Sequence, residues 1–260
     1  MPMPAPFNAF KQALKQGDTV FGCWLGLADT YSAELMGTAG FDWLVIDGEH
    51  APNDLRSIMA QLQVLEASDS HPVVRVPVGE TYLIKQILDA GAQTLLVPMV
   101  DNAEQARQLV RDVTYPPHGD RGVGYALTRA ARFSQIADYG TTADDGICLL
   151  VQVESVKGLE NLNAILAVDG IDGVFIGPAD LAADMGYMGN ALHPDVQDAI
   201  MTALHKIHAA GKAPGILSTH DDMTRDALEA GAQFVAVGAD VLLLSHAAQA
   251  LAGKWRDTLK

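Results

Sequence analysis

The sequence predicts a (β/α)8 barrel, because three observations on its 260 residues agree. Short apolar segments rich in β-branched residues alternate with amphipathic segments, as expected when parallel strands are buried on both faces beneath a layer of helices. The chain also has the usual length of such a barrel, about 250 residues. No Gly-x-Gly-x-x-Gly follows the first expected strand, which leaves an open doubly wound sheet as the second choice. No linker divides the chain, so we expect residues 1–260 to form a single domain.

The expected strands are short apolar runs bounded by turn residues. They are residues 19–25, 43–47, 72–76, 94–98, 147–153, 172–176, 213–217 and 233–237. The expected helices have apolar residues at intervals of three and four. They are residues 31–38, 53–66, 80–89, 102–112, 157–166, 194–210, 221–229 and 240–251. Residues 114–146, with Pro116-Pro117 near their start, predict a long ordered loop followed by short helices.

Three similar joints support this alternation. Ala39-Gly40, Ala90-Gly91 and Ala230-Gly231 each connect the end of a helix to the start of a strand. A glycine at such a joint suits the left-handed conformation that commonly ends a helix. We expect these joints at the N-terminal end of the barrel, away from the site of reaction.

The composition of the chain excludes some classes of partner and indicates where the protein is located. A net charge of -15, from 17 basic and 32 acidic residues, disfavours nucleic acid and anionic membrane as partners. Cys23 and Cys148 both lie in apolar runs and are expected to be buried free thiols. Residues 1–6 lack the basic start and apolar core of a signal peptide, and no run approaches the roughly 18 apolar residues of a membrane span. The cytoplasm is therefore the expected location.

Candidate site residues are sought at the C-terminal ends of the strands, where barrel enzymes place their active sites. Four polar side chains stand out at these ends: His50, Arg75, Glu154 and Asp180. Their neighbours at the strand ends include Trp24, Asp47, Glu49, Gln152, Leu217 and Ser218.

Glu154 and Asp180 follow two strands too apolar to lie on a surface. A buried carboxylate is costly unless it is paired, and two converging carboxylates repel each other. A hard divalent cation would satisfy both, with water or substrate oxygens as further ligands. The alternative is that each carboxylate caps the helix that follows it, and Asp180 before Leu181 fits an N-cap well.

His50 and Arg75 each allow a catalytic and a structural interpretation. Asp47, three residues before His50, could orient the imidazole and raise its basicity, or His50 could simply bond to the backbone. An arginine inside a buried strand needs an anionic partner, which for Arg75 is Glu49, Glu154 or an anionic substrate. No lysine stands at a strand end where a Schiff-base aldolase needs one, so carbanion chemistry here would require a metal.

Five motifs, in this order, resemble the HpcH/HpaI family of class II pyruvate aldolases over residues 21–251. They are Val45-Ile46-Asp47-Gly48-Glu49-His50-Ala51-Pro52, Arg75-Val76-Pro77, Tyr115-Pro116-Pro117 with Arg121-Gly122-Val123-Gly124, Gln152-Val153-Glu154 and Phe175-Ile176-Gly177-Pro178-Ala179-Asp180-Leu181. The members most similar in these motifs cleave 4-hydroxy-2-oxoheptanedioate, and sugar-acid aldolases for 2-keto-3-deoxy acids share the motifs. The resemblance implies a barrel of the phosphoenolpyruvate/pyruvate-domain type.

The resemblance also implies roles for the candidate residues. Glu154 and Asp180 would bind Mg²⁺, Mn²⁺ or Co²⁺. Arg75 would stabilise the enolate oxygen, and His50, oriented by Asp47, would act as the base. The remaining contacts would come from the backbone amides of Ala179 and Asp180 to the pyruvate carboxylate, from Gln152 in the pyruvate pocket, and from Trp24 and Leu217 at the aldehyde end.

The family forms hexamers, as trimers of dimers, in which the last helix is exchanged with a neighbouring subunit. Residues 240–251 are apolar enough for such burial, although ordinary barrel packing predicts the same pattern. The expected reaction is reversible cleavage of a 4-hydroxy-2-oxo acid to pyruvate and an aldehyde, succinic semialdehyde in aromatic catabolism. The alternatives are a sugar-acid aldolase, a CoA-thioester lyase and a non-catalytic metabolite sensor. His220, Arg129 and Arg132 are candidates to contact a distal carboxylate of the substrate.

Overall fold

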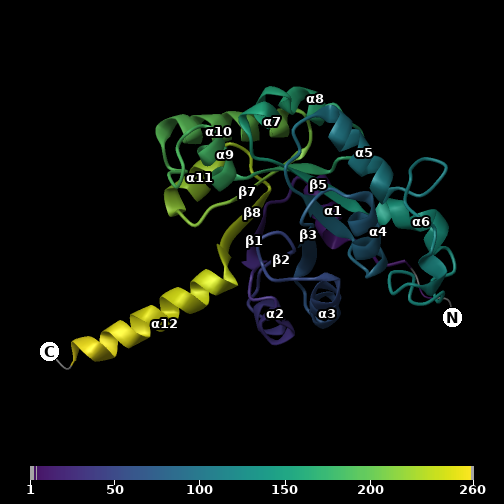
Figure 1. Cartoon of the computed structure of the whole chain (residues 1–260), viewed down its shortest axis with the longest axis horizontal. Coiled ribbons are helices and arrows are strands. Elements are labelled where there is room, and N and C mark those ends of the chain that lie inside the picture. Colours follow the sequence, from purple (N-terminus) through teal and green to yellow (C-terminus); the bar gives the residue numbers. More distant parts are fainter. Residues whose placement is uncertain (1–2, 4, 259–260) are drawn as a thin grey trace.

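The predicted barrel is confirmed by a computed structural model, which describes residue 3 and residues 5–258. Eight parallel strands pair in chain order, and β8 closes the barrel against β1 (Figure 1). The strands are β1 (Val20–Leu25), β2 (Trp43–Asp47), β3 (His71–Arg75), β4 (Thr94–Val97), β5 (Cys148–Val153), β6 (Gly173–Ile176), β7 (Ala213–Leu217) and β8 (Phe234–Ala239). Each contains or overlaps a strand expected from the sequence. The structure does not describe residues 1, 2, 4, 259 and 260. They include both ends of the expected domain and part of the segment that was tested for a signal peptide.

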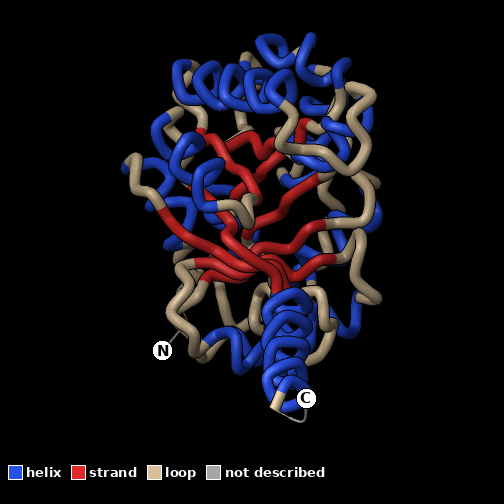
Figure 2. The backbone as a smooth tube through the Cα atoms, turned by 90° about the vertical axis from the view of Figure 1, so that its left-hand side faces the viewer, coloured by secondary structure: helices blue, strands red, loops and turns tan. Residues whose placement is uncertain are grey.

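Helices surround the strands, as Figure 2 shows. They are α1 (Ala9–Gln16), α2 (Thr30–Gly37), α3 (Leu55–Leu65), α4 (Thr81–Asp89), α5 (Ala103–Val113), α6 (Tyr139–Gly146), α7 (Val156–Glu160), α8 (Leu162–Leu166), α9 (Pro178–Asp184), α10 (Pro194–Ala209), α11 (Asp221–Glu229) and α12 (Asp240–Asp257). The helix expected at 157–166 is divided into α7 and α8, and α1 and α9 were not expected. The segment 114–146 is a loop with a short 3-10 turn at Tyr125–Leu127 and ends in α6, as its prolines and glycines indicated.

Aromatic side chains fill the barrel interior, and two glycines make room for them. Trp43 and Phe234 are fully buried there, with ring centroids 5.9 Å apart. A Cβ atom on Gly22 would lie 2.3 Å from the Trp43 ring, and one on Gly215 would lie 2.1 Å from the Phe234 ring. Phe10 of α1 packs on both rings. Helix α1 thus closes the N-terminal end of the barrel and leaves the C-terminal end for the candidate site.

The glycine joints and the cysteines agree with their predictions. Gly40, Gly91 and Gly231 have φ angles of 90°, 107° and 93°, the left-handed conformation that an L side chain resists. Both cysteines are buried and free. Among the described helices, none is sufficiently long and apolar to cross a lipid bilayer.

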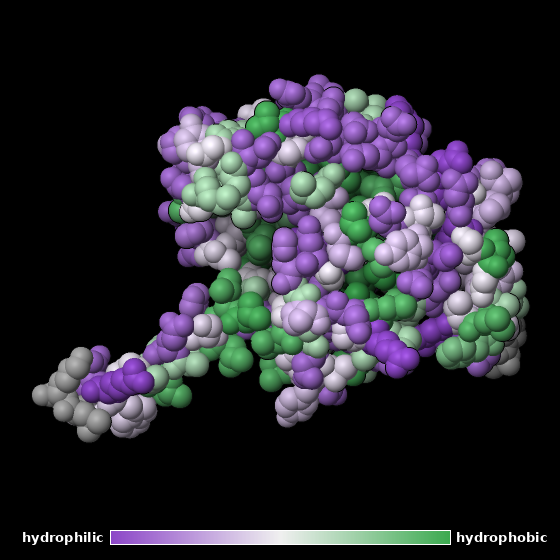
Figure 3. Space-filling view, in the orientation of Figure 1, coloured by the Kyte–Doolittle hydropathy of each residue, from purple (hydrophilic) through white to green (hydrophobic). Residues whose placement is uncertain are grey.

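Helix α12 extends away from the barrel (Figures 1 and 2). It is 18 residues long, and Asp240 is its one buried residue within the described chain. Its exposed large apolar residues are Val241, Leu242, Leu243, Leu244, Leu251 and Trp255. Apolar surface gathers where this helix leaves the barrel (Figure 3). The helix continues six residues beyond the expected end at residue 251.

Candidate active site

Four strands bring the candidate polar residues to one end of the barrel. Asp47 and Arg75 are the last residues of β2 and β3 and are direct partners in the sheet register. Gln152 lies in β5, and Glu154 follows the last residue of that strand. Asp180 lies in the first turn of α9, which begins immediately after β6 and Gly177. The C-terminal ends of parallel neighbours meet at one edge, so residues up to 133 positions apart in sequence share one site.

Arg75 is held in place by two carboxylates and an indole ring. Its Nε donates to Asp47 Oδ1 at 2.9 Å and its Nη2 donates to Asp47 Oδ2 at 2.7 Å. Its Nη1 lies 3.0 Å from Glu49 Oε2, and its guanidinium carbon lies 5.2 Å from the centroid of the Trp24 ring. Asp47 engages two of the five guanidinium N–H groups, so this fork is fixed while other donors remain for a substrate oxygen.

Asp47 therefore has a different partner from the one expected. Its carboxylate binds Arg75 and accepts from the backbone N–H groups of Glu49 and His50, at 3.0 and 3.3 Å, rather than from the imidazole. Burial opposes its charge, but the hydrogen bonds and the charge of Arg75, with the two amides, hold the pKa of Asp47 below its ordinary value. The prediction that Asp47 orients the His50 ring is wrong in this structure, because the adjacent guanidinium offers a bidentate, oppositely charged partner.

The His50 side chain is 66% exposed, and its Nε2 lies 4.0 Å from Glu49 Oε1. Sequence reasoning left the partner of Arg75 open between Glu49, Glu154 and a substrate. The structure assigns Glu49 and adds Asp47. Glu49 thus lies between the guanidinium of Arg75 and the imidazole of His50. The sequence did not predict that Glu49 contacts both groups.

Glu154 is buried, and both of its carboxylate oxygens accept hydrogen bonds. Oε1 accepts from the backbone N–H of Met99 at 2.9 Å, and Oε2 accepts from the side-chain amide of Gln152. Burial, with the negative charges of Asp180 and Glu49, outweighs these bonds and raises the pKa of Glu154 above its ordinary value. A Cβ atom on Gly177 would lie 2.5 Å from Oε2, so a glycine is needed beside this carboxylate.

These residues fit a divalent cation. Four carboxylates, those of Asp47, Glu49, Glu154 and Asp180, lie at this end with the single guanidinium of Arg75, so the site holds more negative charge than its protein cations balance. Within residues 3 and 5–258, no group of three His, Cys, Asp or Glu side chains is arranged to hold a metal ion. The protein would then supply two carboxylates, Glu154 and Asp180, and leave the other positions to water or substrate, which suits Mg²⁺. Gln152 adds a buried carbonyl oxygen that has no hydrogen-bond partner in the described structure.

Asp180 is not an N-cap, contrary to the structural interpretation of its sequence. Gly177 is the cap residue of α9, Pro178 is the first helical residue, and Asp180 is exposed in the first turn. First-turn amides have no partner within their own helix, so the N–H groups of Ala179 and Asp180 are available for an anionic group. Pro178 has no N–H to contribute.

The candidates Trp24, Leu217 and His220 also lie at the C-terminal end of the barrel. Trp24 is buried at the end of β1, with its ring centroid 5.5 Å from that of Phe175. Leu217 is the last residue of β7 and is half-buried. His220 is exposed and precedes α11, also at the C-terminal end of the barrel.

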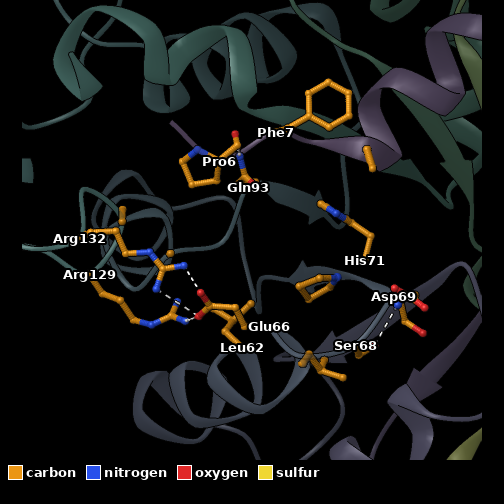
Figure 4. A pocket seen from close by; sticks show the side chains of 16 residues that line it. Pro6, Phe7, Leu62, Glu66, Ser68, Asp69, His71, Gln93, Arg129 and Arg132 are labelled. Atoms are coloured by element: carbon orange, nitrogen blue, oxygen red, sulfur yellow. Dashed lines mark hydrogen bonds and ion pairs between the residues drawn. The ribbon is translucent and has the colours of Figure 1, made fainter. Parts of the chain in front are cut away.

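Arg129 and Arg132 lie elsewhere, which corrects their suggested contact with a distal carboxylate. Both guanidinium groups point to Glu66 and line a cavity of about 390 Å³ that also contains His71 (Figure 4). His71 begins β3, so this cavity belongs to the N-terminal end of the barrel, opposite the candidate site. Sequence position alone could not place residues of the long loop 114–146 at one end or the other.

Met99 is the residue that sequence reasoning missed. It follows Pro98 after β4, is not polar, and contributes its backbone N–H. Its φ angle of 58° is unusual for a residue with a side chain. No signal in the sequence distinguishes this conformation from an extended one.

Comparison with known proteins agrees with this geometry. The family model described as HpcH/HpaI aldolase/citrate lyase matches residues 20–247. A hydroxypyruvate/pyruvate aldolase of Roseobacter denitrificans is 59% identical over 98% of this chain and 100% of its own length. A 4-hydroxy-2-oxo-heptane-1,7-dioate aldolase of Salmonella newport is 56% identical over 95% of this chain and 94% of its own.

Among solved structures, an HpcH/HpaI aldolase/citrate lyase family protein of Burkholderia cenocepacia superposes with a TM-score of 0.92 at 41% identity. The match covers 96% of this chain and 99% of that one. The predicted resemblance is confirmed: the chain belongs to the HpcH/HpaI aldolase/citrate lyase family and is a class II aldolase, a carbon–carbon lyase.

Proposed function

We propose that this aldolase depends on a divalent metal and reversibly cleaves a 4-hydroxy-2-oxo acid to pyruvate and an aldehyde. One observation carries the proposal: the buried Glu154 carboxylate interacts with the charges of Asp180 and Glu49, and Glu49 together with Asp47 holds the Arg75 guanidinium in one orientation. Positive charge fixed next to anionic ligands is what an enolate-forming reaction requires.

Glu154 and Asp180 would hold the ion, with Gln152 keeping the Glu154 carboxylate in position. When bound, Mg²⁺, Mn²⁺ or Co²⁺ supplies positive charge that polarises the carbonyl of the 2-oxo acid. Arg75 donates hydrogen bonds to the keto oxygen as negative charge develops on it. The amides of Ala179 and Asp180 bind the carboxylate of the 2-oxo acid.

His50 would move the proton. In the cleavage direction it accepts the proton of the 4-hydroxyl group while the C3–C4 bond breaks and its electrons pass into the enolate. Exposure of the imidazole at the mouth of the barrel suits exchange of that proton with solvent. Trp24 and Leu217 would border the aldehyde.

The names of the relatives support two substrates. The Salmonella proteins named for 4-hydroxy-2-oxo-heptane-1,7-dioate support that acid, with succinic semialdehyde as the aldehyde product in aromatic catabolism. The second candidate replaces pyruvate with hydroxypyruvate, and relatives of 58–60% identity named hydroxypyruvate/pyruvate aldolase favour it. Both substrates use the same metal and the same Arg75.

Assembly into a homohexamer is part of the proposal. Helix α12 presents four successive exposed apolar residues, Val241 to Leu244, and an isolated chain would leave them in water. A neighbouring subunit that exchanges this helix would cover them. Light scattering after size-exclusion chromatography should give about six chains for the protein and fewer for Leu243→Glu; a monomer for the unchanged protein contradicts this assembly.

The test of the reaction is exchange of the pyruvate methyl protons with D₂O, followed by NMR. We expect exchange to stop when EDTA removes the metal and to return when Mn²⁺ or Mg²⁺ is added. Exchange that persists without metal would contradict the proposed metal dependence. If no exchange occurs even with metal present, another substrate is indicated. Aldol addition to succinic semialdehyde, with pyruvate or hydroxypyruvate as donor, then separates the two substrates.

A further inference from the structure

The backbone at Met99 turns in an unusual way beside Glu154. Met99 has a φ angle of 58°, in the left-handed region that costs a residue with a Cβ roughly 1–2 kcal/mol. Strained residues of this kind persist where surrounding structure enforces them, and they cluster at functional sites. This one lies two residues beyond the end of β4, at the end of the barrel that carries the candidate site.

This turn directs two consecutive backbone N–H groups toward the same neighbouring strand. In an extended strand, neighbouring N–H groups point to opposite sides. Here the N–H of Met99 donates to Glu154 Oε1 at 2.9 Å, and the N–H of Val100 donates to the carbonyl oxygen of Gln152 at 3.0 Å. Both amides therefore face β5 and the residue after it, and the conformation of Met99 sets the angle between them.

The carboxylate that receives this bond has little room to adjust. Its other oxygen accepts from Gln152, and the backbone of Gly177 is so close that a Cβ atom there would contact it at 2.5 Å. A charge-assisted bond from a backbone N–H is stronger than a neutral one and fixes direction. Met99 is 56% exposed, and its hydrogen bond to Glu154 comes from the backbone N–H.

We propose that Met99 is a positioning residue for the metal ligand Glu154: its left-handed backbone aims one N–H at the carboxylate and so fixes the direction of the remaining lone pairs. This inference rests on the proposed metal-dependent function. It assigns the effect to the backbone conformation and none to the thioether.

Substitutions that change the cost of the left-handed conformation test this assignment. Gly and Asn adopt it readily, whereas a β-branched residue resists it most. We measure Mn²⁺ affinity without substrate, from the EPR signal of free Mn²⁺. Met99→Gly and Met99→Asn should bind Mn²⁺ within about twofold of the unchanged protein, and Met99→Val should bind about tenfold more weakly.

The matched control is Phe133→Val. Phe133 has a φ angle of 53° and is exposed on the long loop, so the substitution imposes the same backbone penalty far from Glu154. It should leave Mn²⁺ affinity unchanged. Circular dichroism checks folding, and Met99→Thr, which is smaller and also β-branched, replaces Met99→Val if that variant does not fold.

Each outcome decides one point. If the unchanged protein binds no Mn²⁺, the metal-dependent function fails, and this inference fails with it. If it binds Mn²⁺ and Met99→Val binds equally well, the function stands and the role of Met99 is wrong. Equal weakening in the Gly, Asn and Val variants would also contradict the inference, because it would assign the effect to the side chain.

Discussion

Two carboxylates at opposite ends of the barrel, Glu66 and Glu154, have pKa values shifted in opposite directions. At the N-terminal end, hydrogen bonds and charge from Arg132 and Arg129 lower the pKa of Glu66 against the effect of its partial burial. At the C-terminal end, burial and the neighbouring charges of Asp180 and Glu49 raise the pKa of Glu154, although two hydrogen bonds oppose them. Glu66 is paired with two arginines, whereas Glu154 lies in an environment that disfavours its charge.

We infer from this difference that the N-terminal end of the barrel has a structural role and that the C-terminal end carries the chemistry. Helix α1 closes the N-terminal end with aromatic contacts, and a paired carboxylate there needs no ligand. At the other end the excess of negative charge is retained because a cation and an anionic substrate are expected to complete the site. Carboxylates with a raised pKa in such a position mark sites of chemistry more often than sites of stability.

The largest expected effect follows from removing a carboxylate at the C-terminal end. Glu154→Ala and Asp180→Ala should each lower turnover by about 10³-fold or more, because the proposed metal would lose one of its two protein ligands. Pyruvate release with Mn²⁺ present, followed with lactate dehydrogenase, measures the loss. Glu66→Ala at the opposite end is the control and should retain activity within about twofold, and full activity in either site variant would contradict the metal assignment.

Arg75→Lys should cost about 100-fold in kcat/KM. An ammonium group cannot copy the fork that binds Asp47 through two nitrogens while also contacting Glu49. Arg132→Lys, the same exchange at the N-terminal end, should change kcat/KM by less than about twofold. Similar losses in the two variants would mean that Arg75 is only a structural ion pair.

Double-mutant cycles should show that Asp47 acts on Arg75. Asp47→Asn combined with Arg75→Lys should have a coupling free energy of about 1–2 kcal/mol in kcat/KM, because the two side chains share two hydrogen bonds. Asp47→Asn combined with His50→Gln should couple by less than about 0.5 kcal/mol. The reverse ranking would restore the expected Asp47–His50 pair.

The smallest effect concerns stability and the N-terminal end. Burial lowers the pKa of His71 from its ordinary value of 6.5 to about 4, so the unfolded chain binds this proton more tightly than the folded one. The stability that neutral His71 retains above pH 6.5 is therefore lost as the pH falls toward 4. We expect a loss of about 1 kcal/mol between pH 7 and pH 5.5, measured by urea unfolding.

His71→Gln should remove this part of the pH dependence. His205→Gln, on the exposed face of α10, is the control and should leave the curve unchanged. Identical curves for all three proteins would show that burial does not hold His71 neutral.

Sequence patterns predicted the strands well because a parallel barrel buries each strand on both faces, and so each strand is an apolar run of limited length. The helix at 157–166 was less well predicted, since apolar spacing does not reveal the break at Asn161. Helix α1 was missed because it precedes the first expected strand and so lies outside the alternation, and α9 was missed because it is short and depends on the position of Gly177 and Pro178. Of the candidate site residues, the suggested contacts of Arg129 and Arg132 failed because long loops follow no periodicity.

The sequence by itself determined the barrel, the end of it that carries the polar residues, and the family. These three properties follow from the type and order of the residues, because the alternation of apolar and amphipathic segments and the spacing of the motifs can be read from the sequence. Only the tertiary structure decided the partners: that Asp47 binds Arg75 instead of His50, and that the backbone N–H of Met99 binds Glu154. Such choices depend on distances across neighbouring strands and on one φ angle, and neither is encoded in the identity of a single residue.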